Sequence, residues 1–366
     1  MPNENKPEGG TEMENTKHTG AKLWILAVVL IVLIFVSFLL GRYPVSPAAL
    51  LGILTDRLLK GLGSLLSPLI PSAASWGIRP FWDGSMEAVA WNIRLPRILL
   101  SCMVGCCLSA AGAAFQGVFQ NPMASPDILG ATNGAAFGAA LAILLGAGSV
   151  FITGAAFVSS IVCVLLAFFV SRIASGKQVL TLVLAGIMVG SLFSAGTSFV
   201  KLVADPSNQL PEITYWLMGS LSGATWKEVG MAVIPMVIGL VPLTLLRWRV
   251  NILTLGDDEA RTMGVNAPRV RRIVIIAATL ITAAAVSVSG MIGWVGLVIP
   301  HLSRKLVGND YRHLLPASML FGAAFLLAVD DVSRTLLATE IPIGILTAFI
   351  GAPFFIWLIT RKGEAF

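Results

Sequence analysis

Apolar runs of membrane-spanning length dominate this sequence. A bilayer core of roughly 30 Å needs about 20 residues of helix to cross it, and runs close to that length recur along the chain. The composition agrees, because 56% of the side chains are hydrophobic and 12% are charged, against about 45–50% and about 25% in soluble domains. Soluble enzymes, collagen-like chains and disordered chains are therefore excluded, and an all-α polytopic membrane protein is predicted. The clear runs are 23–40, 95–119, 128–146, 150–171, 179–200, 229–247, 313–333 and 341–360.

A further apolar run, Ile273 to Leu302, is too long for one crossing. One helix of that length would reach about 45 Å at about 1.5 Å per residue, well beyond the bilayer core. Basic residues flank both of its ends, which places both ends on one side of the membrane and favours a hairpin with its turn near 290–293. The total becomes about ten transmembrane helices. The flanking residues are Arg269, Arg271, Arg272, Arg304 and Lys305.

The chain divides into a polar tail and one transmembrane domain. Residues 1–20 lack hydrophobic periodicity and are predicted to be a disordered cytoplasmic tail, followed by a single domain over 21–362. With the amino terminus inside, most of the 25 Lys and Arg residues fall in cytoplasmic segments. Both termini are therefore predicted to lie on the cytoplasmic side of the cell membrane. We attribute the basic excess to this topology and expect no nucleic-acid partner.

A long outer loop is predicted over 42–93. Its part from Gly61 to Trp82 mixes Leu, Ile, Ser, Gly, Pro and Trp and is expected to lie on the membrane surface. The alternative is a functional cap over the outer mouth.

A weak internal similarity suggests an inverted repeat. An offset of 178 residues aligns Ser109, Gly112, Pro122 and Gly130 with Ser287, Gly290, Pro300 and Gly308. The two copies would begin five crossings apart and so have opposite orientations, as in many transporters. In such a Gly-rich chain, chance is the alternative explanation for four matches.

The sequence has few groups that could perform chemistry inside the membrane. The acidic residues fall in loops, the tail or the ends of spans, so a bound coupling ion would lack the ligands that ion-driven transporters carry at membrane depth. No H-E-x-x-H motif or metal-ligand cluster is present, and the four cysteines have the pattern of small core residues. We therefore predict no catalytic residue, no metal site and no cofactor. The sequence also lacks a phosphate-binding G-x-x-x-x-G-K-[ST] loop, so energy for transport would come from a separate ATPase.

The longest cytoplasmic segment, 247–272, has the features of a coupling loop. Residues 257–263 are predicted to form a short helix that Gly264 ends. A short helix on the inner face suits contact with an ATPase. An amphipathic connector on the lipid surface is the alternative.

Three arginines are predicted to lie on the outer face of the membrane, opposite the coupling loop. Arg94 and Arg97 flank Pro96 at the mouth of the second span, where exposed guanidinium groups could bind carboxylates of a partner. Snorkelling to the interface is the alternative. For Arg334, the alternative is pairing with Asp330, four residues earlier on the same helix face.

Glycines at four-residue spacing, such as Gly134 with Gly138 and Gly186 with Gly190, predict close helix packing. Lining of a wide central pathway is the other interpretation.

These features together resemble the FecCD family, the permease subunits of ATP-driven importers for iron-siderophore complexes, haem and cobalamin. The similarity runs from about Leu23 to Lys362. The motifs that carry it are RLPR (94–97), GVFQNPMASPDILG (117–130), LAG (184–186), YWLMG (215–219), LG (255–256) with MGV (263–265), GLVIPH (296–301), EIPIG (340–344) and GAPF (351–354).

The resemblance implies a cobalamin-importer-permease-like fold and a set of partners. These are two ATP-binding subunits that hold ATP and Mg, a second permease subunit for which an identical copy is favoured, an external substrate-binding protein, and membrane lipid. The binding protein would be periplasmic or lipid-anchored. The stretch 205–219 is also similar to a subgroup that includes molybdate or tungstate importers, so the cargo stays open. An ion-coupled secondary transporter is the less favoured alternative.

The resemblance also implies three functional sites. Arg94, Arg97 and Arg334 would dock glutamates of the binding protein, with Asp330 orienting Arg334. The inner-face turns at Asn121, Met123, Val179 and Leu180 are candidates for the cytoplasmic gate. The ATPase would contact the coupling segment, represented by Leu253, Leu255, Gly256, Ala260, Met263, Gly264 and Val265.

Overall fold

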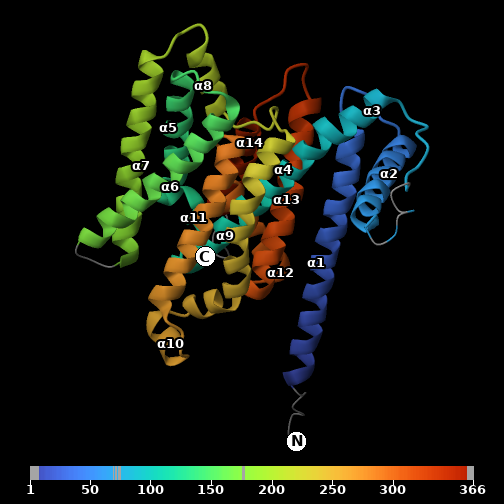
Figure 1. Cartoon of the computed structure of the whole chain (residues 1–366). Helices are drawn as coiled ribbons and strands as arrows, with labels where there is room; N and C mark the ends of the chain where they lie inside the picture. The colour runs from blue at the N-terminus through green and yellow to red at the C-terminus, as the bar shows by residue number, and fades with distance from the viewer. Residues whose placement is uncertain (1–7, 69, 71, 73–75, 175–177, 361–366) are drawn as a thin grey trace, which may run out of the picture.

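The computed structural model describes residues 8–68, 70, 72, 76–174 and 178–360, which form a bundle of helices (Figure 1). The first half contains α1 (Glu8–Leu39), α2 (Pro47–Leu66), α3 (Gly84–Ala88), a π-helical turn η2 (Val89–Arg94), α4 (Leu95–Val118), a 3₁₀ turn η3 (Pro126–Leu129), α5 (Ala131–Leu144) and α6 (Ser149–Ile173). The second half contains α7 (Gln178–Val203), α8 (Gln209–Leu217), α9 (Trp226–Leu253), α10 (Asp257–Thr262), α11 (Ala267–Ser289), α12 (Val295–Val307), α13 (Tyr311–Thr335) and α14 (Ile343–Thr360).

Each expected crossing coincides with a helix, which confirms the all-α polytopic prediction. Among the described residues, 7 helices are long and apolar enough to cross a membrane. The others are shorter, and α12 has 13 residues, or about 20 Å of helix. The predicted hairpin is confirmed, since α11 ends at Ser289 and Gly290 leaves it with φ +68°.

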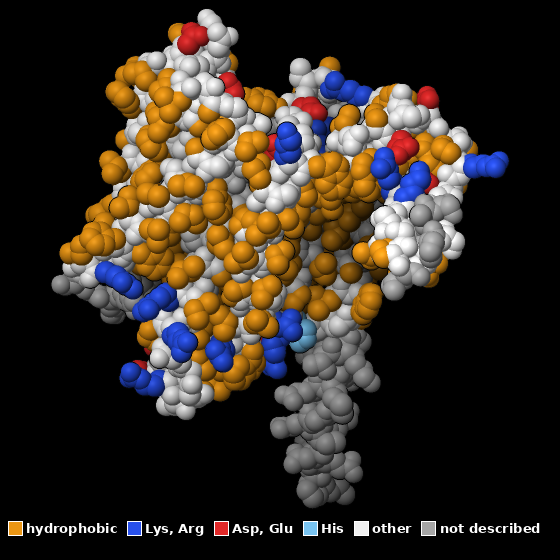
Figure 2. Space-filling model, viewed as in Figure 1, with side chains coloured by type: hydrophobic (Ala, Val, Ile, Leu, Met, Phe, Trp, Pro, Cys, Tyr) orange, Lys and Arg blue, Asp and Glu red, His pale blue; other side chains and the backbone are white. Residues whose placement is uncertain are grey.

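The two ends of the bundle differ in charge. Figure 2 shows a broad apolar band with Lys and Arg side chains gathered below it, at the end where Figure 1 places α10. We call this the α10 end. Lys22 of α1 and the last turns of α14 also lie there, because Lys22 donates to the Leu306 carbonyl at 2.7 Å and the Lys305 ammonium lies over the Trp357 ring. A hydrophobic band between polar ends is the pattern of a multi-pass membrane protein.

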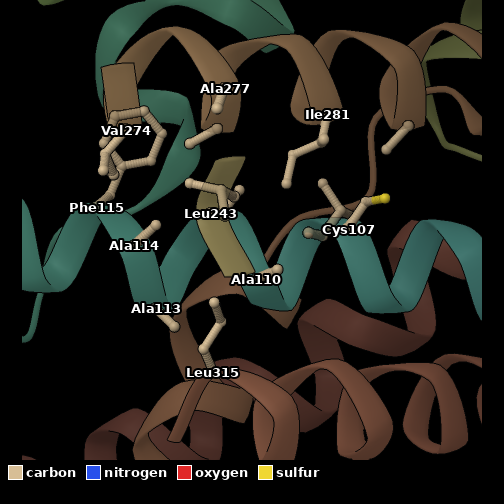
Figure 3. Close-up of a cluster of buried hydrophobic side chains, with 14 of the residues drawn as sticks. Cys107, Ala110, Ala113, Ala114, Phe115, Leu243, Val274, Ala277, Ile281 and Leu315 are labelled. Carbon is tan, nitrogen blue, oxygen red and sulfur yellow. The ribbon is translucent and has the colours of Figure 1, made fainter. Parts of the chain in front are cut away.

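Helix α4 is the centre of the bundle, and nearly all of its side chains from Leu100 onward are buried. Figure 3 shows its small residues, among them Ala110, Ala113 and Ala114, between α11 on one side and Leu315 of α13 on the other. Leu243 of α9 also reaches this cluster. Small side chains on α4 therefore allow several helices to pack closely around it.

Glycines bring the backbones of these helices together. A Cβ atom on Gly112 would lie 1.7 Å from the Gly296 carbonyl oxygen of α12, and one on Gly105 would lie 2.2 Å from the Gly322 oxygen of α13. Gly138 of α5 approaches the Ala155 carbonyl of α6 in the same way, at 2.3 Å. The prediction of close helix packing at glycines is confirmed.

One expectation about the amino-terminal part needs correction. Helix α1 begins at Glu8, although residues 1–20 were expected to have no regular structure; adding turns to an existing helix costs little. Residues 1–7 lie outside the described part. The outer loop contains α2, which buries one face including Leu50 and Ile53. Most described side chains of 61–82 are exposed, and the placement of that segment on the membrane surface stays a prediction.

The helix bounds do not follow the 178-residue offset. Gly112 lies inside α4, whereas Gly290 ends α11. The inverted repeat therefore stays a prediction without support from the helix bounds at this offset.

The contact between α4 and α12 gives a test of the packing. We expect Gly112→Val to destabilise the protein by about 1–3 kcal/mol or more, because the new side chain overlaps the Gly296 backbone. Thermal unfolding of the purified protein in detergent measures the effect. Gly154→Val in α6 is the matched control, since a Cβ there meets nothing within 4 Å; equal stability of the two variants would contradict the packing.

Candidate functional site

The short helix α10 lies between two glycines with positive φ. Gly256 precedes it with φ +126° and Gly264 follows it with φ +75°, conformations that glycine adopts without strain. Its first turn carries Asp257, Asp258 and Glu259, which suits the positive end of the helix dipole. The predicted short helix and its stop at Gly264 are thus confirmed.

The residues predicted for ATPase coupling divide into two groups. Leu253 and Ala260 are fully buried and Val265 is nearly so, and all three belong to the main hydrophobic core. Leu255 and Met263 are instead 62% and 55% exposed. One group fixes the segment to the bundle, and the other presents apolar side chains at the α10 end.

An ion pair holds α10 against α11. Arg271 is buried and donates from Nη2 and Nη1 to the two carboxylate oxygens of Asp257, at 2.7 and 3.2 Å. This hydrogen bonding lowers the pKa of Asp257 below its ordinary value, against the opposing effect of partial burial. Nearby, Gln120 Nε2 donates to the Leu253 carbonyl at 2.6 Å and so joins the end of α4 to the end of α9.

A second charged cluster lies at the opposite end of the bundle, around Arg97 in the first turn of α4. Arg97 Nε and Nη2 donate to the Asp330 carboxylate of α13 at 2.9–3.0 Å, and Nη1 donates to Glu340 Oε1 at 2.9 Å. Asp330 is fully buried, while the Glu340 side chain is 31% exposed. The second oxygen of Glu340, Oε2, is buried and makes no hydrogen bond among the described residues.

Arg94 and Arg334 fix the end of α1. Arg94 donates to the carbonyls of Phe38 and Tyr43. Arg334 donates to the carbonyl and hydroxyl of Ser37 at 2.7 and 2.6 Å, and it pairs with Asp331. These contacts join α1, α4 and α13 into one polar network.

The expected exposure of the three arginines is wrong. Arg94, Arg97 and Arg334 are 4%, 7% and 8% exposed, because internal carbonyls and carboxylates use their guanidinium groups. The alternative considered for Arg334, pairing with Asp330, is not formed either, since Asp330 binds Arg97 and Asp331 binds Arg334. Docking of a partner at these residues stays a prediction.

Sequence reasoning missed Ser37, Asp331 and Glu340 as members of this network. Glu340 stood within a recognised motif, yet it is 243 positions from Arg97, and only the fold shows that they meet. Ser37 carried no signal at all in its apolar run.

The gate candidates lie in two separate elements. Asn121 and Met123 are exposed in the turn after α4, where Asn121 Oδ1 accepts from the Met123 amide at 2.8 Å. Leu180 is 57% exposed near the start of α7; the side chain of Val179 lies outside the described part. Further along α7, Gly186 lies against Ile128 and Leu129 of η3, and Gly190 lies against Gly130 and Asn133. Their gating role stays a prediction.

No group of three or more His, Cys, Asp or Glu side chains within the described ranges could hold a metal ion. The cysteines lie in apolar surroundings, and Cys107 and Cys163 are buried.

The fold defines a multi-pass membrane permease. The chain belongs to the FecCD transport family, and the match covers residues 29–361. Members of this family are permeases of ATP-binding-cassette importers, transport subunits that in general work with a partner ATPase and a substrate-binding protein.

Individual relatives agree with this assignment. The cobalamin import system permease BtuC of Halobacterium salinarum is 42% identical over 279 residues, 75% of this chain and 74% of that protein. The molybdate import system permease MolB of Haemophilus influenzae is 42% identical over 277 residues, 75% of this chain and 81% of that protein.

A solved structure shares the fold. It comes from a transporter assigned to the metal-chelate type of ABC transporters, in an inward-facing conformation. It matches with a TM-score of 0.79 at 36% identity over 93% of this chain and 98% of its own. The resemblance to FecCD permeases is thereby confirmed.

The Asp257–Arg271 pair predicts how firmly α10 is held. We expect Asp257→Asn to accelerate amide hydrogen exchange in residues 257–263, because Arg271 loses its ionic partner. Asp258→Asn is the control, since Asp258 is exposed and has no ion pair among the described residues. Equal exchange in both variants would contradict the role of the pair.

The same pair predicts a pH dependence. Because the pKa of Asp257 is lowered from its ordinary 3.8, the stabilisation is complete above that value and is lost only as the pH falls through the lower folded-state pKa. After correction for the intrinsic pH dependence of exchange, protection of α10 should therefore stay constant from pH 8 to pH 5. A loss of protection near neutral pH would contradict the assignment.

Proposed function

We propose that this chain translocates a metal chelate through the membrane, powered by a separate ATPase that docks on α10. The observation that carries the proposal is the exposed apolar pair Leu255 and Met263 on a short segment that the buried Leu253, Ala260 and Val265 fix to the bundle. Exposed apolar side chains at a membrane protein's polar end are typical of a protein interface. The chain itself holds no ATP, Mg or other cofactor in this proposal, and none of its residues is catalytic.

The coupling step follows from how α10 is fixed. A displacement of α10 would be passed to α11 through Arg271 and Asp257, and to α9 through the buried Leu253. Both helices contact α4, the centre of the bundle. The proposed gate at Asn121, Met123, Val179 and Leu180 would open through this motion of packed helices, which is how closely packed elements usually transmit change.

We place the α10 end in the cytoplasm, since basic residues gather there (Figure 2). Both described chain ends then lie on the cytoplasmic side; Arg361 and Lys362 lie outside the described part. The complete importer would contain two copies of this chain, two ATPases and one external binding protein.

Cargo is proposed as a metal chelate such as cobalamin, haem or an iron-siderophore complex. Support comes from the relative named for cobalamin and from the solved transporter of metal-chelate type. A molybdate or tungstate oxyanion is the second candidate, because the relative named for molybdate has the same 42% sequence identity to this chain as the relative named for cobalamin. Uptake of each labelled cargo by proteoliposomes with the cognate binding protein separates the two.

The ATPase contact is tested by Leu255→Ser and Met263→Ser. Each removes an apolar side chain that the ATPase would bury, worth about 1.5 kcal/mol, so the affinity for the ATPase should fall about tenfold. Binding is measured with the purified ATPase and the detergent-solubilised permease. Thr262→Ser on the same helix, which is exposed, should leave the affinity unchanged.

Native mass spectrometry provides the decisive check on the assembly. Two permease chains with two ATPases are expected. A permease without any ATPase, combined with uptake driven by an ion gradient alone, would overturn the proposal in favour of a secondary transporter.

Docking of the binding protein is proposed at Arg97. A carboxylate of the partner would replace Glu340, which is the only member of the described Arg97 cluster that is partly exposed. We therefore expect Glu340→Gln to raise the affinity for the binding protein severalfold, because it removes the competing negative charge at Nη1 of Arg97, while Asp330 keeps Nε and Nη2.

The affinity can be measured in lipid nanodiscs with the purified binding protein. Glu212→Gln is the matched control, as Glu212 is exposed in α8 and has no ion pair among the described residues. A Glu340→Gln affinity equal to that of the control would count against docking at Arg97.

A further inference from the structure

Two adjoining cavities lie between the α10 ends of α6, α7 and α11. The first, of about 260 Å³, is lined by Arg172, Arg271 and Arg272 together with Ser171 and Thr181. The second, of about 450 Å³, runs along α6 and α11 and is lined by apolar side chains, with Arg172 and Arg272 at its rim. The two cavities share Phe168, Arg172 and Arg272. A basic pocket thus continues directly into an apolar groove.

The arginines of this pocket have unused hydrogen-bonding capacity. Arg172 and Arg272 are exposed and form no ion pair among the described residues. Arg271 is 8% exposed, and although Asp257 occupies its two terminal nitrogens, its Nε is buried without a hydrogen-bond partner. Three guanidinium groups around one small cavity form a site for a phosphate or another oxyanion.

The groove has the dimensions of one acyl chain in one leaflet. Ile161 and Arg172, the two ends of its lining on α6, lie eleven positions apart, which corresponds to about 16 Å of helix. Half of a bilayer core is about 15 Å. Leu165, Phe169 and Ile276 in its walls are 60%, 63% and 55% exposed, so the groove opens towards the lipid.

We propose that this groove binds one anionic phospholipid from the leaflet on the α10 side. The phosphate lies between Arg172, Arg271 and Arg272, and one acyl chain lies along α6 and α11. A basic pocket between transmembrane helices at the cytoplasmic surface is a known form of anionic lipid site. A soluble phosphate would use only the smaller cavity and leave the apolar groove open, whereas a lipid fills both.

The position of the site gives the lipid a route to α10. Arg271 contributes to the pocket and also holds Asp257 at the start of α10. A bound phosphate would order the Arg271 side chain and so reduce the freedom of α10. Anionic lipid is therefore expected to stabilise the segment proposed to contact the ATPase.

The test uses the purified full chain in detergent, stripped of lipid and titrated with phosphatidylglycerol under native mass spectrometry. We expect one tightly bound phosphatidylglycerol per chain, no comparable binding of phosphatidylcholine, and no displacement by millimolar inorganic phosphate. The double variant Arg172→Gln/Arg272→Gln should lose at least tenfold in phosphatidylglycerol affinity. Arg249→Gln is the matched control, because Arg249 is exposed on α9, unpaired among the described residues and outside both cavities.

A second variant tests the groove without changing any charge. Ile276→Trp should fill the groove and weaken phosphatidylglycerol binding about tenfold while all three arginines remain, and it keeps the test valid if the double variant fails to fold. Retention of wild-type affinity in Ile276→Trp, equal binding of the two lipids, or displacement by inorganic phosphate would overturn the proposal. A loss of dimer in Ile276→Trp without loss of lipid would instead assign the groove to a second copy of this chain.

Discussion

Close approach of helix backbones is the constraint on which this structure depends. In a bilayer, apolar burial drives helix association weakly, because lipid tails are as apolar as the side chains. The bundle instead relies on contacts in which α4 touches α12 and α13 through glycine backbones at Gly112 and Gly105. Alanines on the same helix leave room for α9 and α11 (Figure 3). Small residues therefore set how closely the other helices approach α4, and large buried side chains such as Leu100 and Phe115 fill the space around them.

Charged contacts fix the two ends of this bundle in different ways. At the end opposite α10, Arg97 and Asp330 join α4 to α13, and Asp331 and Arg334 join α13 to Ser37 of α1. Removing one member of a buried ion pair leaves an uncompensated charge. At the α10 end, the Asp257–Arg271 pair is half open to solvent, since the Asp257 side chain is 54% exposed. The buried pairs opposite α10 are therefore costly to break, whereas the partly exposed Asp257–Arg271 pair can be broken or rearranged at a small cost in free energy.

The hydropathy pattern, together with glycines and charged residues at helix ends, predicts most of the fold. Glycine and charge placement located the turn at Gly290 and the end of α10 at Gly264, because both depend on local backbone geometry. The partners of Arg97 could not be predicted, since Asp330 and Glu340 lie more than 230 positions away in sequence. The prediction that Arg94 is exposed was also wrong. Its partners are main-chain carbonyls at and just after the end of α1, and a main-chain carbonyl cannot be recognised from residue type. Local sequence rules predict the helices and where they end. Side-chain pairs between residues far apart in sequence can be identified only once the helix packing is known.

Helix α11 connects these observations. Its hairpin turn at Gly290 lies at one end, its alanine-rich face packs on α4, and its first turns carry Arg271 and Arg272 side by side. Consecutive helical residues point about 100° apart, so Arg271 can turn inward to Asp257 while Arg272 faces the groove along α6. A force on α10 and a lipid at the groove therefore act on the same helical turn. Because α11 is packed along its length against the central helix, either influence would reach the core of the bundle without a change of fold.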